Sequence, residues 1–210
     1  MTDLANRQDR FEGITLAESR RLIERGIQII NQNAVYCVAV SCDLAEIEPL
    51  LPRHINGFEG AYPVCCHLAM MMMGSLVAKS GTGERIAYFF DSGHEHESAA
   101  ARFMHLAQQL PHFADQYRHY SHAFASDDDV TQLQAADVLA WEWSKYLDET
   151  VMQRQRHMRR SLAELLIGSR DGPRGFDRSR TAVAHLAGEP LRRFASKVHG
   201  IFMKGISQET

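Results

Sequence analysis

No apolar run in this 210-residue chain approaches the roughly 20 residues that a membrane-spanning helix needs. The first residues also carry no signal-peptide pattern of a basic start, an apolar centre and a small-residue cleavage site. We therefore expect a soluble, cytoplasmic protein with no membrane partner. A hydrophobic fraction of 45% allows a sizeable core, and the length fits one domain with an appendage or at most two small domains.

Cysteine is scarce, and its four positions (37, 42, 65 and 66) do not have the spacing of a zinc site. Cys37 falls in the apolar run 34–40, and Cys65 and Cys66 are adjacent in a Met-rich segment. The pattern predicts buried thiols in a reducing compartment rather than disulfides or metal ligands. A nucleotide-binding phosphate loop is absent as well, because no Lys-Ser/Thr pair follows the glycines of residues 80–83.

The apolar residues alternate between helical and strand periodicity along the chain. Thr15 and Glu18 form a capping-box pattern at the start of the first helix, which we expect to end near Asn31. The order of elements predicts an α/β fold with a largely parallel sheet. The later expected elements are a strand at 34–41, a short helix capped by Asp43, a helix at 62–79, a strand at 85–90, a helix at 95–110, a strand at 117–125, a helix at 133–146, a helix at 151–166, a linker at 168–180 and a closing helix at 191–202.

Charge is distributed unevenly along the chain. Residues 1–149 have a net charge of −10 and residues 150–210 a net charge of +7, which together give −3. This asymmetry favours either a carboxylate site beside a strip that binds phosphates, or a basic tail that docks on its own acidic body. The candidate nucleic-acid-binding residues of the basic part are Arg154, Arg159 and Arg160.

Leu133–Tyr146 is the most informative stretch, because Ala and Leu recur in it while Gly and Pro are absent. At about 100° per residue, Gln134, Asp137 and Trp141 share one face of the predicted helix. An amide and a carboxylate would be costly to bury in so apolar a helix without partners. A bound metal or substrate would supply partners. A solvent-exposed helix edge, or a buried pair that caps nearby backbone, is the alternative interpretation.

Two motifs resemble those of the domain-of-unknown-function 3800 family. Residues 133–142 read LQAADVLAWE, which is similar to the family's signature near its carboxyl end, and residues 86–93 read IAYFFDSG, a strand that ends in an acidic residue and a glycine. The resemblance covers residues 1–167. It implies a ribonuclease-H-like, three-layer α/β fold with a mainly parallel central sheet, and a metal-dependent nuclease. Residues 168–210 are then a basic linker and a carboxyl-terminal helix that packs on the same domain.

The resemblance implies Asp91 and Asp137 as catalytic metal ligands. Two-metal phosphoryl transfer needs carboxylates that converge on Mg²⁺ or Mn²⁺ ions about 4 Å apart. Gln134, one helical turn before Asp137, would orient a ligand or contact the scissile strand. Glu142 is a weaker candidate, because it lies about 140° around the helix from Asp137. His94 is a candidate general base, although the acidic residues beside it are better explained as the first turn of a helix.

The start of the chain departs from the family pattern. Such proteins open with a hairpin that carries an Asp-Glu-Ser-Gly-like signature, whereas residues 1–4 resemble the segment after it. We expect the hairpin to be missing, through a late start codon or true loss. The sheet would then expose an unpaired edge that favours a homodimer, and the site would lose one carboxylate. Two functions follow: a nuclease, or a non-catalytic module that binds nucleic acid or protein.

Overall fold

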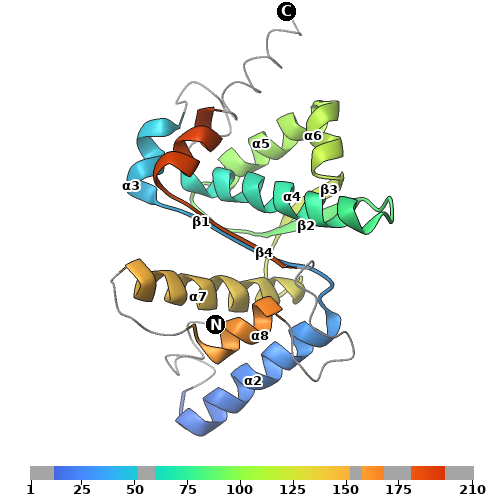
Figure 1. The fold of residues 1–210 in the computed structure, drawn as a ribbon. Coiled ribbons are helices and arrows are strands. Elements are labelled where there is room, and N and C mark those ends of the chain that lie inside the picture. Colours follow the sequence, from blue (N-terminus) through green and yellow to red (C-terminus); the bar gives the residue numbers. More distant parts are fainter. Residues whose placement is uncertain (1–11, 52–59, 152–157, 168–180, 197–210) are drawn as a thin grey trace, which may run out of the picture. The chain divides into compact units, whose positions relative to one another are not determined.

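The computed structural model describes residues 12–51, 60–151, 158–167 and 181–196, which form a mixed α/β protein (Figure 1). The chain divides into two compact units. Unit 1 comprises residues 1–39 and 127–182, and unit 2 comprises residues 40–126 and 183–210. Each unit has its own cluster of buried apolar side chains.

The described elements follow the predicted alternation of helix and strand. They are α2 (Leu16–Asn33), β1 (Cys37–Cys42), α3 (Leu44–Ile47), the 3-10 helix η2 (Glu48–Leu50), α4 (Ala61–Ser80), β2 (Ile86–Asp91), α5 (Glu97–Gln109), α6 (Pro111–Gln116), β3 (His119–Ala125), α7 (Gln132–Val151), α8 (Arg160–Ile167) and β4 (Thr181–Leu186). Residues 188–196 are helical.

In unit 1, the helices α2, α7 and α8 pack against one another (Figure 1). The predicted capping box at the start of α2 is confirmed: the Thr15 N–H donates to the Glu18 carboxylate at 2.8 Å, and the Glu18 N–H donates to the Thr15 hydroxyl at 3.2 Å. The helices are held together by burial of their apolar stripes. The core residues are Ile27, Ala39, Leu139, Trp143, Leu162, Leu165 and Leu166.

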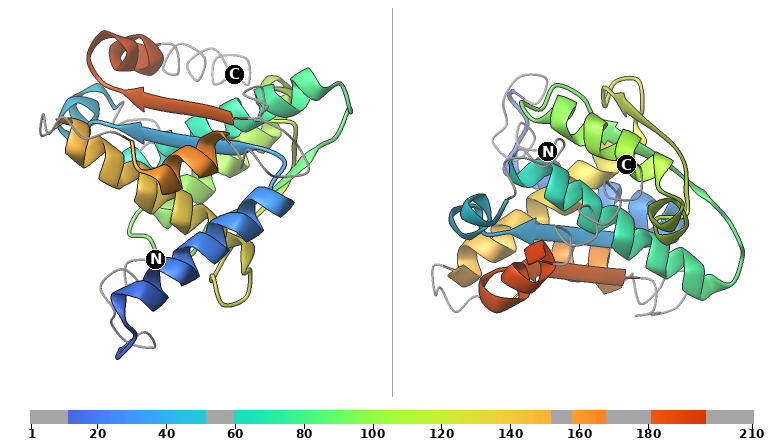
Figure 2. Two further views of the ribbon diagram at one scale, coloured as in Figure 1. Left: turned by 60° about the horizontal axis from the view of Figure 1, so that its bottom comes forward. Right: turned by 90° about the horizontal axis from the view of Figure 1, so that it is seen from above.

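In unit 2, α4 packs beside α5, as Figure 2 shows. The core of unit 2 combines aliphatic side chains with three fully buried aromatic rings, those of Phe103, Phe113 and Tyr117. The buried Tyr117 hydroxyl hydrogen-bonds Nδ1 of His67, and the Tyr88 hydroxyl donates to the Tyr117 carbonyl at 2.6 Å. The polar atoms of these large rings are therefore satisfied inside the core.

The described strands form two parallel pairs, β1 with β4 and β2 with β3, rather than the expected single central sheet. In the second pair, Tyr88 lies opposite His122 and Asp91 lies opposite Ala125. The α/β class and the parallel strands are confirmed. The prediction of a single sheet was wrong, because β1 pairs with β4. The strand β4 was not predicted; it lies between the predicted linker and the predicted closing helix.

Two further elements differ from the prediction. The helix α6 was missed, because it is only six residues long and begins at Pro111, where the missing amide does no harm. The expected helix at 151–166 is wrong in its extent: α7 continues to Val151, residues 158–159 are not helical, and α8 begins at Arg160. The predicted linker at 168–180 lies outside the described residues.

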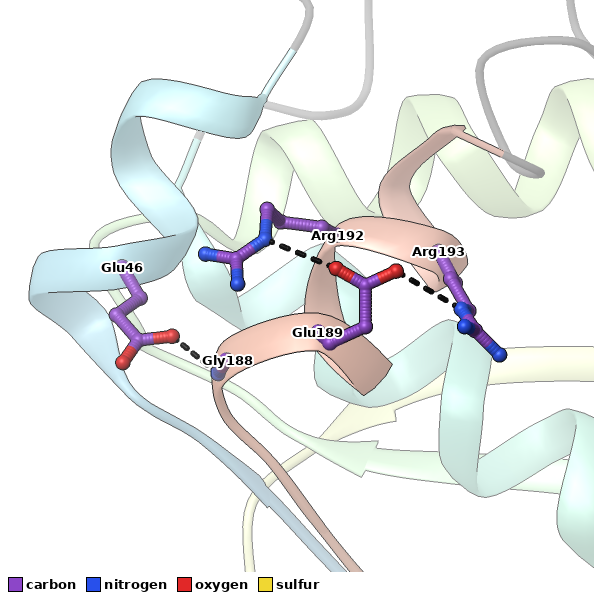
Figure 3. Close-up of polar contacts among 5 residues, drawn as sticks. All are labelled: Glu46, Gly188, Glu189, Arg192 and Arg193. Carbon is purple, nitrogen blue, oxygen red and sulfur yellow. Dashed lines mark hydrogen bonds and ion pairs between the residues drawn. The ribbon is translucent and has the colours of Figure 1, made fainter.

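The helical segment 188–196 packs in unit 2, where Leu191 is fully buried. Its first backbone N–H, that of Gly188, donates to the Glu46 carboxylate of α3 (Figure 3). Within the segment, Glu189 pairs with Arg192 at 3.3 Å and with Arg193 at 2.9 Å, as Figure 3 also shows. A carboxylate at a helix start satisfies an orphan amide and interacts well with the helix dipole.

The helix α4 is, by length and composition, apolar enough to cross a membrane, which the sequence prediction had overlooked. Half of its most apolar window is buried inside the protein, and Val64, Leu68 and Met70 belong to the core of unit 2. A buried core helix passes the same test of length and hydropathy. The finding is therefore weak evidence for a membrane span.

Candidate functional site

Asp91 is the last residue of β2, and its side chain is exposed. The strand alternates between half-buried and exposed positions, and the pairing with β3 continues one step further, because the Ser92 N–H donates to the Ala125 carbonyl at 3.0 Å. Gly93 then takes a φ of 89°, which favours glycine and turns the chain away from the sheet. The predicted position of Asp91 at the carboxyl end of a parallel strand is confirmed.

The turn after Asp91 is held by two local hydrogen bonds. The Gly93 N–H donates to the Glu97 carboxylate at 2.6 Å, and the His96 N–H donates to Nδ1 of His94 at 3.1 Å. Glu97 is the first residue of α5, so its charge also lies at the favourable end of the helix dipole. This network fixes the imidazole of His94 close to the end of the strand.

Tyr62, in the first turn of α4, joins the same region. Its ring stacks on His94, with the ring centroids 4.0 Å apart. Burial and the Cys66 thiol raise the pKa of Tyr62 well above its usual value, and the carboxylates of Asp91 and Glu97 raise it further. The phenol of Tyr62 is therefore a hydrogen-bond donor well beyond the pH at which an ordinary tyrosine ionises. We call Tyr62, Asp91, His94 and Glu97 the β2-end cluster.

The β2-end cluster was only partly predictable. The sequence analysis named Asp91 from the strand that ends in an acidic residue and a glycine, and His94 from its place beside Asp91. Tyr62 was missed, because nothing in the sequence connects the start of α4 with a turn some 30 residues later. The close approach of the two segments requires Gly60, where an added Cβ would lie 2.7 Å from the His96 ring.

The donor types of this cluster fit a hard cation. Carboxylate oxygen is the ligand that Mg²⁺ prefers, and Mg²⁺ usually takes one or two protein carboxylates and keeps several waters. The Asp91 carboxylate has no hydrogen bond or ion pair within the described part of the chain, whereas Glu97 is engaged by Gly93. Of the two carboxylates in the β2-end cluster, Asp91 is thus the one that is available to hold a metal. No group of three or more His, Cys, Asp or Glu residues suited to a metal ion is found among residues 12–51, 60–151, 158–167 and 181–196.

Gln134 and Asp137 lie on α7 in unit 1, and both are exposed. The Gln134 amide makes a long contact of 3.5 Å with the Asp127 carbonyl. This face of α7 is therefore the solvent-exposed helix edge of the alternative interpretation. Because the amide and the carboxylate stay in water, they carry no desolvation cost. Asp91 belongs to unit 2, so the structure describes the two carboxylates in separate units.

The buried carboxylate of α7 is Glu142, which the sequence ranked as the weaker candidate. Glu142 is only 2% exposed, and its Oε2 has no hydrogen-bond partner among the residues that the structure describes. Arg159 pairs with it, with Nη1 at 3.9 Å from Oε2, and the same guanidinium lies 5.3 Å from the centre of the Trp141 ring. Glu142 lies about 140° around α7 from Asp137, so Glu142 faces the core of unit 1 when Asp137 faces solvent. The spacing of the two residues in the sequence already contains this relationship.

The predicted nucleic-acid-binding arginines differ in their surroundings. Arg159 is held by Glu142 and Trp141. The Arg160 side chain is 93% exposed and donates to Glu164 at 2.7 Å. Arg154 lies outside the described residues. Of the arginines that the structure describes here, Arg160 is the more accessible to a phosphate.

Comparison with protein-family models, with curated proteins and with solved structures gives no match to this chain.

Proposed function

We propose that this protein is a metal-dependent nuclease that hydrolyses phosphodiester bonds, with Asp91 and Asp137 as ligands of Mg²⁺ or Mn²⁺. The observation that carries the proposal is the exposed Asp91 carboxylate at the carboxyl end of a parallel strand, which is the place where α/β sheets gather their ligands. The motifs around Asp91 and Asp137 support it by their resemblance to the domain-of-unknown-function 3800 family and its ribonuclease-H-like fold.

The residues have distinct roles in this proposal. A bound divalent cation activates water and stabilises the leaving oxygen of the phosphodiester. Gln134, exposed one turn before Asp137, contacts the scissile strand. His94 is the base that accepts a proton from water, and the stacked ring of Tyr62 holds its imidazole in place. Arg160 binds a phosphate of the nucleic acid, and its ion pair with Glu164 is broken when it does so.

The test is a cleavage assay on labelled single- and double-stranded DNA and RNA with Mg²⁺ or Mn²⁺. We expect cleavage by the unaltered protein, and a loss of at least a hundredfold in Asp91→Asn and Asp137→Asn, because a neutral amide binds a hard cation poorly. Asp115→Asn and Asp148→Asn are matched controls: both carboxylates are exposed and pair with surface cations. Cleavage that survives in chelator, or in Asp91→Asn, would overturn the proposal.

A second candidate is a non-catalytic module that binds nucleic acid or forms a homodimer through a sheet edge. It is favoured by two aromatic side chains of the β2–β3 pair, Phe89 and Tyr120, which are 51% and 72% exposed. Exposed rings stack on the bases of single-stranded nucleic acid. Binding of a labelled oligonucleotide in chelator, weakened at least tenfold in Phe89→Ala or Tyr120→Ala, would favour this candidate. Equal binding by the variants would count against it.

A further inference from the structure

Two thiols that are distant in sequence meet in unit 2. Cys42 is the last residue of β1, and Cys65 lies in the first half of α4. Their Sγ atoms are 3.6 Å apart, and the pair is partly buried. The two residues are separated by 23 positions, so the contact is a product of the fold rather than of local sequence.

The other two cysteines are placed differently. Cys66 is next to Cys65 but points about 100° around the helix, and it is 5% exposed. Its neighbour is Tyr62, whose hydroxyl interacts with the thiol. Cys37 belongs to unit 1, where it packs against the core of that unit. The Cys42–Cys65 pair is therefore the place where two sulfur atoms already touch.

We propose that Cys42 and Cys65 are a reversible oxidation site, at which a hydroperoxide converts the two thiols into a disulfide. Sulfur atoms that are 3.6 Å apart need only small side-chain rotations to reach the bonding distance of about 2 Å. This proposal does not rest on the proposed nuclease activity.

The chemistry has two steps. The Cys42 sulfur attacks the O–O bond of the hydroperoxide, takes one oxygen to become a sulfenic acid, and releases an alcohol, or water when the oxidant is hydrogen peroxide. The Cys65 sulfur then attacks the Cys42 sulfur, and the sulfenic oxygen leaves as water with the thiol proton. The peroxide bond is reduced by two electrons, one from each thiol. A dithiol reductant reverses the bridge by thiol–disulfide exchange.

The electrostatics support this assignment of roles. The hydrogen bond from Cys65 lowers the pKa of Cys42, although burial and the Asp43 carboxylate oppose the shift. The same pairing, together with burial, raises the pKa of Cys65. Burial alone raises the pKa of Cys37 to about 11, and burial raises that of Cys66 to about 12. Because the thiolate is the nucleophile, Cys42 reacts first and Cys65 resolves the sulfenic acid.

The test treats the full chain with hydrogen peroxide, blocks the remaining thiols with iodoacetamide and maps the peptides by mass spectrometry. We expect a linked peptide pair that contains Cys42 and Cys65, and that is lost on treatment with dithiothreitol. Cys42→Ser and Cys65→Ser abolish the linked pair. Cys37→Ser is the matched control and keeps it.

A second measurement tests the order of the two steps. In Cys65→Ser, we expect dimedone to trap a sulfenic acid on Cys42, since no resolving thiol remains. The proposal is overturned if unaltered protein retains alkylated Cys42 and Cys65 after oxidation. It is also overturned if the bridge joins Cys65 to Cys66 or links two chains. Circular dichroism of each variant before oxidation shows that a lost bridge is not a lost fold.

Discussion

The ring of Tyr62 lies nearly parallel to the imidazole of His94, with centroids 4.0 Å apart and planes 12° from parallel. The contact joins the first turn of α4 to the turn after β2, and it places a protonated phenol beside the Asp91 carboxylate. Two segments that are distant in sequence thus meet next to one exposed carboxylate. In our account this arrangement positions the metal ligand of unit 2.

The stack predicts a ring-current signature. In Tyr62→Leu, the carbon-bound imidazole protons of His94 lose the shielding of the phenol ring, so we expect their NMR resonances to move downfield. The resonances are assigned by comparison with His94→Gln. Tyr120→Leu is the control, because Tyr120 is 72% exposed and has no ring contact with His94. Unchanged His94 shifts in Tyr62→Leu would contradict the stack.

Two helical glycines predict stability changes of opposite sign. A Cβ added at Gly74 of α4 would overlap the Gln116 carbonyl oxygen and lie 2.9 Å from the Tyr117 Cα. We therefore expect Gly74→Ala to lower the free energy of unfolding by about 1–3 kcal/mol. Gly26 of α2 has nothing within 4 Å of its added Cβ, so Gly26→Ala should raise that free energy by about 0.5–1 kcal/mol. Urea denaturation measures both, and a stabilising Gly74→Ala would show that α4 and α6 are packed differently.

We expect substitution of the neighbouring residues Arg159 and Arg160 to have very different effects on the free energy of unfolding. Arg159→Ala leaves the buried Glu142 carboxylate without its cation, so we expect a loss of about 1–3 kcal/mol. Arg160→Ala breaks a surface pair and should leave the free energy of unfolding unchanged. If Glu142→Gln is introduced first, the effect of Arg159→Ala should shrink. Equal effects of Arg159→Ala in both backgrounds would contradict the pairing.

The stability of unit 2 should depend on pH through His119 and His122. Burial, the neighbouring His122 and Arg85 lower the pKa of His119, and burial and His105 lower that of His122. Depressed folded-state pKa values mean that the unfolded chain binds more protons between those values and about 6.5. Stability is therefore complete above pH 6.5 and falls as the pH drops through the depressed values. The slope of melting temperature between pH 5 and 7.5 should flatten in His119→Gln, and an unchanged slope would refute the assignment.

The sequence predicted the features that depend on local chemistry. The capping box of Thr15 and Glu18, the Asp43 cap of α3 and the end of β2 at Asp91 are all confirmed, because each is decided by residues within one or two turns. The same reasoning missed α6 and β4, which are short and carry weak periodicity.

The candidate site was harder to predict, because its geometry is not local. Tyr62 reaches His94, and Cys42 reaches Cys65, only through packing that joins separate elements. For α7, the sequence analysis left open whether the face with Gln134 and Asp137 is exposed or buried. In the structure Asp137 is exposed, and the buried carboxylate is that of Glu142. The apolar neighbours Leu139 and Trp143, which enter the core, decide that rotation of the helix.

The most direct test of the proposed function is a calorimetric titration of Mn²⁺ into the purified protein, into Asp91→Asn and into Asp115→Asn. Asp115 is an exposed carboxylate that pairs with Arg85, just before the opposite end of β2, so its variant controls for the loss of one surface charge. We expect saturable binding to the unaltered protein and to Asp115→Asn, and none to Asp91→Asn. Absence of binding to the unaltered protein, or equal binding to Asp91→Asn, would contradict the account.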